Sequence, residues 1–339
     1  MRIPGSLIGL PGIKILGIIY MAALKLKKSF EMRGLGVLIA TIVLAIVFSI
    51  VNSSFLSPYN LLITVRMASE LGIIAAGVTL LMVAGEFDLS VGSTYALCPM
   101  VTAILYSNFN VPIIFAVMVG LMLALVLGFI NGFITTKAGI PSFITTLGTM
   151  LIYRAVVLVM AGGMPIKIRS QALISDVIGG TIGELFPVAI IWFLFFIGIS
   201  YYILEHTAFG NKIRATGGNK EAAIAAGIKT TRVKIITFMF VSFLAAFAGY
   251  VQCFRLGSVA PLNGRGFELQ AIAASVIGGT SLFGGFGTVI GTALGVLITG
   301  MIKNGIVLLG VSVYWQNGFL GAILIAAVII NTFISKRRR

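Results

Sequence analysis

The sequence contains few cysteine, histidine and acidic residues, and each shortage excludes a class of function. Cys98 and Cys253 are the only cysteines, and both lie in apolar surroundings, so we expect no disulfide framework. His206 is the only histidine, and it has no Cys, Asp or second His at ligand spacing. We therefore predict that the chain has no metal site and no catalytic residues.

The sequence also lacks a phosphate-binding loop. The pattern GxxxxGK[ST] does not occur, and the Gly-rich segment 278–287 contains no lysine. We therefore expect the chain to bind no cofactor and to hydrolyse no ATP. The net charge of +15 does not indicate a nucleic-acid partner, because no segment combines a dense basic face with interleaved aromatic residues.

Apolar residues are abundant: 59% of the 339 residues are hydrophobic and 10% are charged. A soluble domain of this length cannot bury so much apolar surface, so the composition predicts an all-α polytopic membrane protein. The apolar segments predict about ten transmembrane helices, at residues 34–51, 60–84, 91–106, 112–135, 141–161, 187–204, 235–252, 268–279, 288–302 and 318–334. The glycines at 278–287 leave a count of eight or nine open.

Most Lys and Arg residues lie in segments that this topology places on one side of the membrane. These segments are residues 1–33, Lys137, residues 207–234 and the tail 336–339. Because cytoplasmic segments carry an excess of Lys and Arg, we expect both termini to be cytoplasmic. Residues 1–33 are predicted to be an inner-face interfacial segment, and residues 34–335 the transmembrane domain.

Few polar features interrupt the predicted spans. Arg66 and Glu70 are four residues apart on one helix face, and we expect them to pair with each other. Gly128 and Gly132 have the spacing of a close helix contact. Asp88 or Ser90, in the break at 85–93, can cap the helix that follows. For Asp88 we favour capping or structural pairing over contact with a substrate.

Residues 207–234, here called the basic loop, differ from the apolar segments on either side. Gly217 and Gly218 are expected to end one short element, after which Asn219 can cap a second helix with Glu221 in its first turn. Gly227 is the expected end of that helix. Two interpretations remain open: an ordinary cytoplasmic loop, or a docking element for a soluble partner.

Two stretches resemble one family of transport proteins. Residues 85–93 read GEFDLSVGS, which is similar to the G-x-x-DLSVGS signature of ribose-type permease subunits of ATP-binding-cassette importers. Residues 210–227, followed by the run at 270–282 that ends in GGTSL, resemble the C-terminal half of the same family. The motif residues are Asp88, Leu89, Ser90, Gly92, Ser93, Gly278, Gly279, Thr280 and Ser281. The resemblance covers about residues 35–335. Glu86 and Phe87 stand where many members carry Gly-Ile, and we expect little effect.

The resemblance implies a vitamin-B12-importer-like (type II) permease fold of about ten helices, some of them broken, in the lipids of the cell inner membrane. It implies partners: a second permease subunit, either identical or a paralogue, ATP-binding subunits that use ATP and Mg, and an extracytoplasmic binding protein that delivers a simple sugar. Residues 210–227 correspond to the coupling helices of such permeases. The residues expected to contact the ATPase are Gly210, Gly218, Asn219, Glu221, Ala222, Ala223 and Gly227.

The residues that contact the solute, and the solute itself, remain open at this stage. A neutral sugar needs hydrogen-bonding side chains, and the candidates are Asn131, Gln252, Asn263, Gln316 and Asn317. Within the superfamily the alternatives are a nucleoside or a branched-chain amino acid. An ion-coupled secondary transporter would need an intramembrane carboxylate, for which Glu70 is the candidate. Gly-lined breaks argue against a membrane scaffold without transport.

Overall fold

The computed structural model describes residues 33–168, 172–183 and 185–312, together with residues 315, 316, 318, 319, 321, 322 and 325. Its long helices are α2 (Arg33–Val51), α3 (Pro58–Val83), α4 (Val91–Phe109), α5 (Ile113–Lys137), α6 (Ser142–Ala161), α8 (Val188–His206), α11 (Thr230–Leu256) and α13 (Val289–Leu308). Shorter helices are α7 (Leu173–Gly179), α9 (Ala208–Gly218), α10 (Lys220–Ala225) and α12 (Phe267–Ile277). Short strands are β1 (Ile166–Lys167), β2 (Thr181–Ile182), β3 (Phe186–Pro187) and β4 (Ser258–Val259).

Six of the described helices, α3, α5, α6, α8, α11 and α13, are long and apolar enough to cross a membrane, and α2 and α12 carry shorter apolar segments. The chain is therefore a multi-pass membrane protein, as predicted, and the helices lie close to the predicted spans. The tail 336–339, residues 1–32 and most of the predicted span 318–334 lie outside the described residues.

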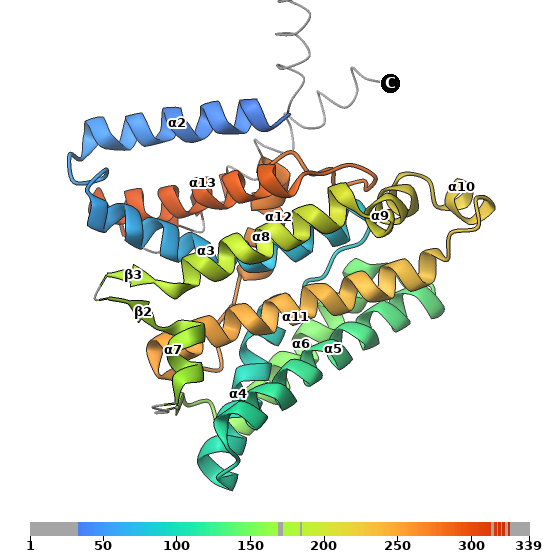
Figure 1. Ribbon diagram of the computed structural model, residues 1–339, viewed down its shortest axis with the longest axis horizontal. Helices are drawn as coiled ribbons and strands as arrows, with labels where there is room; N and C mark the ends of the chain where they lie inside the picture. The colour runs from blue at the N-terminus through green and yellow to red at the C-terminus, as the bar shows by residue number, and fades with distance from the viewer. Residues whose placement is uncertain are drawn as a thin grey trace, which may run out of the picture.

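The connecting segments gather at two opposite ends of the molecule (Figure 1). The basic loop, which contains α9 and α10, lies at one end, and α7, β2 and β3 lie at the other. The turn at 139–141 joins the basic loop, since Gly139 and Pro141 line a pocket together with Lys220. At the opposite end β1 pairs with β4 in antiparallel register, Ile166 facing Val259. The structure thus groups the connecting segments as the predicted topology groups them.

Helix α11 runs through the centre of the molecule and packs closely on α5. A Cβ atom on Gly128 would lie 2.6 Å from the Met239 Cα, and one on Gly132 would lie 2.8 Å from the Ile235 Cα. Both distances are shorter than real Cβ contacts, so only glycine permits this approach of two backbones. The predicted close contact at Gly128 and Gly132 is confirmed, and its partner is α11.

This contact yields a stability prediction. We expect Gly128→Leu to lower the thermal unfolding midpoint of the purified protein, because overpacking at a closed contact costs about 1–3 kcal/mol. Gly148→Leu is the matched control, since nothing lies within 4 Å of a Cβ at Gly148 of α6. The measurement is the midpoint in detergent. Equal midpoints for the two variants would contradict the tight α5–α11 contact.

Hydroxyl and amide groups join α3, α12 and α13 across their buried faces. The Thr79 hydroxyl lies 2.6 Å from the Thr292 hydroxyl and 3.1 Å from the Ser275 hydroxyl. Asn304 donates to the Asn60 side-chain oxygen at 2.8 Å. Such bonds are the usual connection between membrane helices, where apolar burial gives little specificity. Helices α3, α12 and α13 therefore form one unit, and this unit carries both breaks in the chain, 84–90 and 278–288.

Candidate functional site

The basic loop folds into two short helices with defined caps. Thr207 accepts a hydrogen bond from the Gly210 N–H at 3.1 Å and starts α9, which ends at Gly218. The Asn219 side chain accepts from the Ala222 N–H at 3.0 Å and starts α10. Gly227 follows α10 with a φ of 79°. The predicted element end at Gly217-Gly218, the Asn219 cap and the stop at Gly227 are all confirmed.

The side chains of α10 divide between the interior and the surface. Ala223 is 3% exposed and packs inside the chain. Ile224 is 54% exposed, and Glu221 and Ala222 beside it are also exposed. Gly210 is buried at the start of α9, where a Cβ would overlap the carbonyl groups at the end of α8. The other residues predicted to contact the ATPase, Gly218, Asn219 and Gly227, are exposed. The accessible surface therefore centres on Ile224.

Five glycines bring the basic loop into backbone contact with both breaks; we call Gly85, Gly217, Gly218, Gly284 and Gly285 the glycine junction. A Cβ on Gly284 would lie 2.6 Å from the Gly217 carbonyl oxygen and 2.9 Å from the Gly85 Cα. A Cβ on Gly285 would lie 2.7 Å from the Gly218 Cα. The Gly285 N–H also donates to the Val83 carbonyl at 2.8 Å. No side chain separates these backbones, so α9 is in direct backbone contact with both breaks.

An ion pair reinforces this connection. The Lys234 ammonium, near the start of α11, contacts the Glu86 carboxylate in the first break, and each side chain is 12% exposed. We expected the change at Glu86 to have little effect, whereas the structure gives this carboxylate a partner 148 residues away. The pair fixes the start of α11 against the residues that follow α3.

The first family motif is a buried network at the start of α4. Asp88 accepts from the Ser90 N–H at 2.8 Å and from the Ser90 hydroxyl at 2.7 Å. The Asn131 amide donates to the Ser90 hydroxyl at 2.8 Å. Leu89 N–H donates to the Thr146 hydroxyl at 3.0 Å. Ser90 occupies the cap position of α4 without capping it through its side chain. The structure thus gives Asp88 a local structural role, in a network that ties the break to α5 and α6.

The remaining motif residues shape close backbone contacts and turns. A Cβ on Gly92 would overlap the Glu268 carboxylate, and one on Gly278 would overlap the backbone of Gly291. The Ser93 hydroxyl donates to the Met150 carbonyl at 2.8 Å. Gly279 has a φ of 90°. The Thr280 N–H donates to the Ser275 carbonyl, and the Ser281 N–H to the Phe286 carbonyl, both at 2.9 Å. The second motif therefore forms the turn that carries Gly284 and Gly285 to the junction.

Comparison with known proteins shows the family of this chain. Residues 60–328 match the family described as the permease component of the branched-chain amino acid transport system. The chain belongs to this family. It is 39% identical over 300 residues to the ribose import permease protein RbsC of Bacillus subtilis strain 168, a match that covers 88% of this chain and 93% of the relative. The resemblance seen in the sequence is thereby confirmed.

Further relatives are also named as sugar import permeases. The permease is 37% identical over 299 residues to the ribose import permease protein RbsC of Escherichia coli K12, covering 87% of this chain and 92% of the other. It is 31% identical over 323 residues to the xylose/arabinose import permease protein XylH of Sulfolobus acidocaldarius, covering 93% and 88%. No solved structure matches the chain.

A polar cluster lies in the half of the permease away from the basic loop. The Glu70 carboxylate pairs with Arg255, whose Nη2 lies 2.8 Å away, and also accepts from Gln252 at 3.3 Å and Tyr95 at 3.2 Å. The predicted Arg66–Glu70 pair is therefore wrong: the i,i+4 spacing correctly puts both residues on one face, but Arg255 of α11 reaches the carboxylate. Because Glu70 has this cationic partner, the structure does not favour its use as an ion-binding carboxylate.

The candidates for solute contact fall in different environments. Asn131 is fully buried in the Asp88 network. Gln252 is half-buried beside Glu70, and the Asn263 carbonyl accepts from Arg154 at 3.0 Å. Gln316 donates to the Lys303 carbonyl at 3.3 Å, and Asn317 lies outside the described residues. The structure does not bring these candidates into a single site, so they stay predictions.

Sequence reasoning missed several residues that connect the permease internally. Three features were not predicted: the junction role of Gly85, Gly217, Gly284 and Gly285, the Glu86–Lys234 pair, and the contact of Arg255 with Glu70. Paired glycines at the ends of polar breaks were visible in the sequence, and they are a usable signal for close backbone approach. The charge pairs gave no comparable signal, because their members lie 148 and 185 residues apart.

Proposed function

We propose that this chain is the membrane-spanning permease subunit of an ATP-binding-cassette importer that takes up a simple sugar. The family match and the ribose-permease relatives carry the proposal. The glycine junction, through which a protruding basic loop meets the two chain breaks, supports a coupling role for that loop. A protruding loop can pass a movement to the breaks only if it is rigidly attached to them. Packed contacts can provide this attachment, because they do not deform continuously. Relatives named as ribose and xylose/arabinose import permeases support the sugar as the solute.

In this proposal other subunits supply the energy for transport. Separate ATP-binding subunits, which use ATP and Mg, dock on the basic loop, and an extracytoplasmic binding protein delivers the sugar. A second permease subunit, either identical or a paralogue, completes the pathway. The membrane is the cell inner membrane, the basic loop and both termini are cytoplasmic, and about ten helices adopt a vitamin-B12-importer-like fold. The excess of Lys and Arg in the basic loop supports this orientation.

The docking surface is the exposed side of α10. Ile224 is a large apolar side chain at the tip of the basic loop, flanked by the exposed Glu221 and Ala222. At protein interfaces a few side chains carry most of the binding energy, and the contacts around them contribute little. Because Ala223 packs inside the chain, we place its role in supporting α10 rather than in direct contact.

The proposal predicts ATP-dependent sugar uptake that requires Ile224. In proteoliposomes containing the permease, its ATP-binding subunit and its binding protein, we expect uptake of labelled ribose, xylose or arabinose but not of leucine or adenosine. The permease alone should show no ATPase activity. Ile224→Asp should weaken binding of the ATP-binding subunit by at least about tenfold, since loss of an interface anchor has this size of effect.

Leu173→Asp is the matched control, because Leu173 is an exposed apolar residue on α7 at the opposite end. Its binding to the ATP-binding subunit should equal that of the wild type. Uptake of leucine or adenosine in place of sugar would refute the solute assignment. Normal binding by Ile224→Asp would refute the docking surface.

A further inference from the structure

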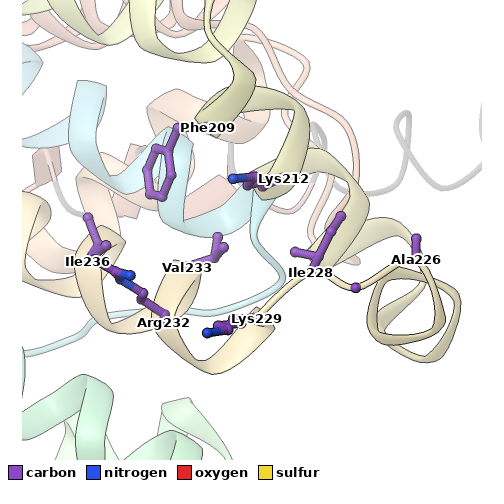
Figure 2. Close-up of a pocket in the computed structure, with 9 residues that line it drawn as sticks. Phe209, Lys212, Ala226, Ile228, Lys229, Arg232, Val233 and Ile236 are labelled. Atoms are coloured by element: carbon purple, nitrogen blue, oxygen red, sulfur yellow. The ribbon is translucent and has the colours of Figure 1, made fainter.

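A groove of about 590 Å³ lies between α9 and the start of α11 (Figure 2). Three cationic side chains line it: Lys212 from α9, and Lys229 and Arg232 from the start of α11. The remaining lining residues are apolar or small: Phe209, Ala226, Gly227, Ile228, Val233 and Ile236. Figure 2 shows Phe209 and Lys212 on the α9 side, across the groove from Arg232, Val233 and Ile236.

Among the described residues, no acidic side chain pairs with the cations of this groove. No acidic residue lines the groove, and in the part of the chain that the structure describes none of its cations forms an ion pair. Two neighbouring cations behave differently, since Arg214 pairs with Glu205 and Lys234 pairs with Glu86. Unpaired cations gathered around one concave surface attract an anion.

The groove lies at the depth expected for lipid headgroups. Between Lys234 and Gln252, α11 carries no charged residue, and Ile236 lies one turn past Arg232, about 6 Å along the helix axis. Tyr202, near the end of α8, is 61% exposed. Exposed tyrosines at helix ends are typical of the membrane interface. The cations therefore stand where a membrane-spanning helix meets the headgroup region.

The apolar wall continues out of the groove toward the lipid-facing surface. A second groove shares Ile228, Lys229, Arg232 and Ile236 with the first; it adds Phe129 of α5, which is 45% exposed, and reaches Ile224 of α10. A soluble anion would satisfy the cations but leave this apolar surface uncovered. A molecule with a phosphate and long alkyl chains covers both parts, as expected for basic pockets between membrane helices.

We propose that this groove binds an anionic phospholipid. Lys212, Lys229 and Arg232 contact the headgroup phosphate, and the acyl chains lie along Ile236 and Phe129. Because Lys212 belongs to α9 and the other two cations to the start of α11, the bound lipid holds together the two elements from which α10 protrudes. The lipid site goes beyond the proposed importer function, and its occupancy can be measured without transport.

The test is a native mass spectrometry titration of the full chain in detergent. Phosphatidylglycerol should bind the wild type, and phosphatidylcholine should not. Lys212→Gln/Lys229→Gln/Arg232→Gln should weaken phosphatidylglycerol binding by about a hundredfold, given the usual contribution of each cation near a lipid surface. The control Lys137→Gln/Lys167→Gln/Lys220→Gln removes the same charge from exposed positions and should bind like the wild type.

Several results would overturn the lipid site. These are equal weakening in both triple variants, unchanged binding in the groove variant, or equal binding of phosphatidylcholine. Displacement of phosphatidylglycerol by inorganic phosphate at similar concentration would show a soluble-anion site instead.

A second measurement uses the unmodified chain and does not depend on folding of a variant. In phosphatidylglycerol vesicles, acetylation of Lys212 and Lys229 should be slower than in phosphatidylcholine vesicles, while the exposed Lys220 should be modified at the same rate in both. Acetylation of each of the three lysines at the same rate in both kinds of vesicle would contradict the proposal. So would protection that occurs only when the ATP-binding subunit is present, since the groove would then belong to a protein interface.

Discussion

Replacing Gly217 with alanine is expected to reduce sugar uptake by about tenfold or more while leaving the protein inserted in the membrane. A loss of about tenfold lies within the usual range of coupling energies between two sites. A Cβ at this position would overlap the Val83 carbonyl oxygen and lie 2.9 Å from the Gly285 nitrogen. Both neighbours are backbone atoms, which cannot rotate away as a side chain can. The last turn of α9 must therefore move away from both breaks.

Gly218→Ala is the matched control for this change. Gly218 is the next residue of α9, but a Cβ there would lie 3.7 Å from the Gly285 Cα, an ordinary van der Waals contact. The two variants thus make the same chemical change one residue apart. The measurement is ATP-dependent uptake in proteoliposomes, normalised to the binding of the ATP-binding subunit by each variant, because Gly218 is also predicted to contact that subunit. If Gly217→Ala transports as well as Gly218→Ala, the junction does not transmit the movement.

The local features of this fold could be predicted because each is encoded by neighbouring residues. Long apolar runs gave the spans, and Asn219 followed by Glu221 gave the start of α10. Gly128 and Gly132 predicted a close helix contact, since their spacing puts both on one face of α5. Their partner α11 could not be known, because helix spacing shows which face is small and not what covers it.

Features that depend on the tertiary arrangement were missed or wrong. Arg66 was the only cation near Glu70 along the chain, yet the carboxylate pairs with Arg255 from another helix. The hydrogen bond from Asn131 to Ser90 was also missed, because it joins α5 to the first break. The helix α7 and the strands β1–β3 between α6 and α8 were not predicted. The strands depend on pairing with distant residues, since β1 pairs with β4.

Reversing the charge at Glu86 is expected to lower both stability and transport. Glu86→Lys places two ammonium groups together at side chains that are each 12% exposed, and breaking a buried ion pair costs about 3–5 kcal/mol. The partial exposure here puts the expected loss near the lower limit, about 3 kcal/mol. Repulsion would push the start of α11 away from the first break, so uptake should fall with the thermal unfolding midpoint.

Two further variants separate the pair from the general effect of charge. The double variant Glu86→Lys/Lys234→Glu restores opposite charges and should regain most of the stability and uptake. Glu205→Lys reverses one member of the exposed Glu205–Arg214 pair, whose side chains are 32% and 28% exposed, and should change stability by no more than about 1 kcal/mol. If the double variant is as impaired as the single one, Glu86 acts through its shape or its other neighbours. A loss in Glu205→Lys equal to that in Glu86→Lys would instead show a non-specific response to added positive charge at this end of the protein.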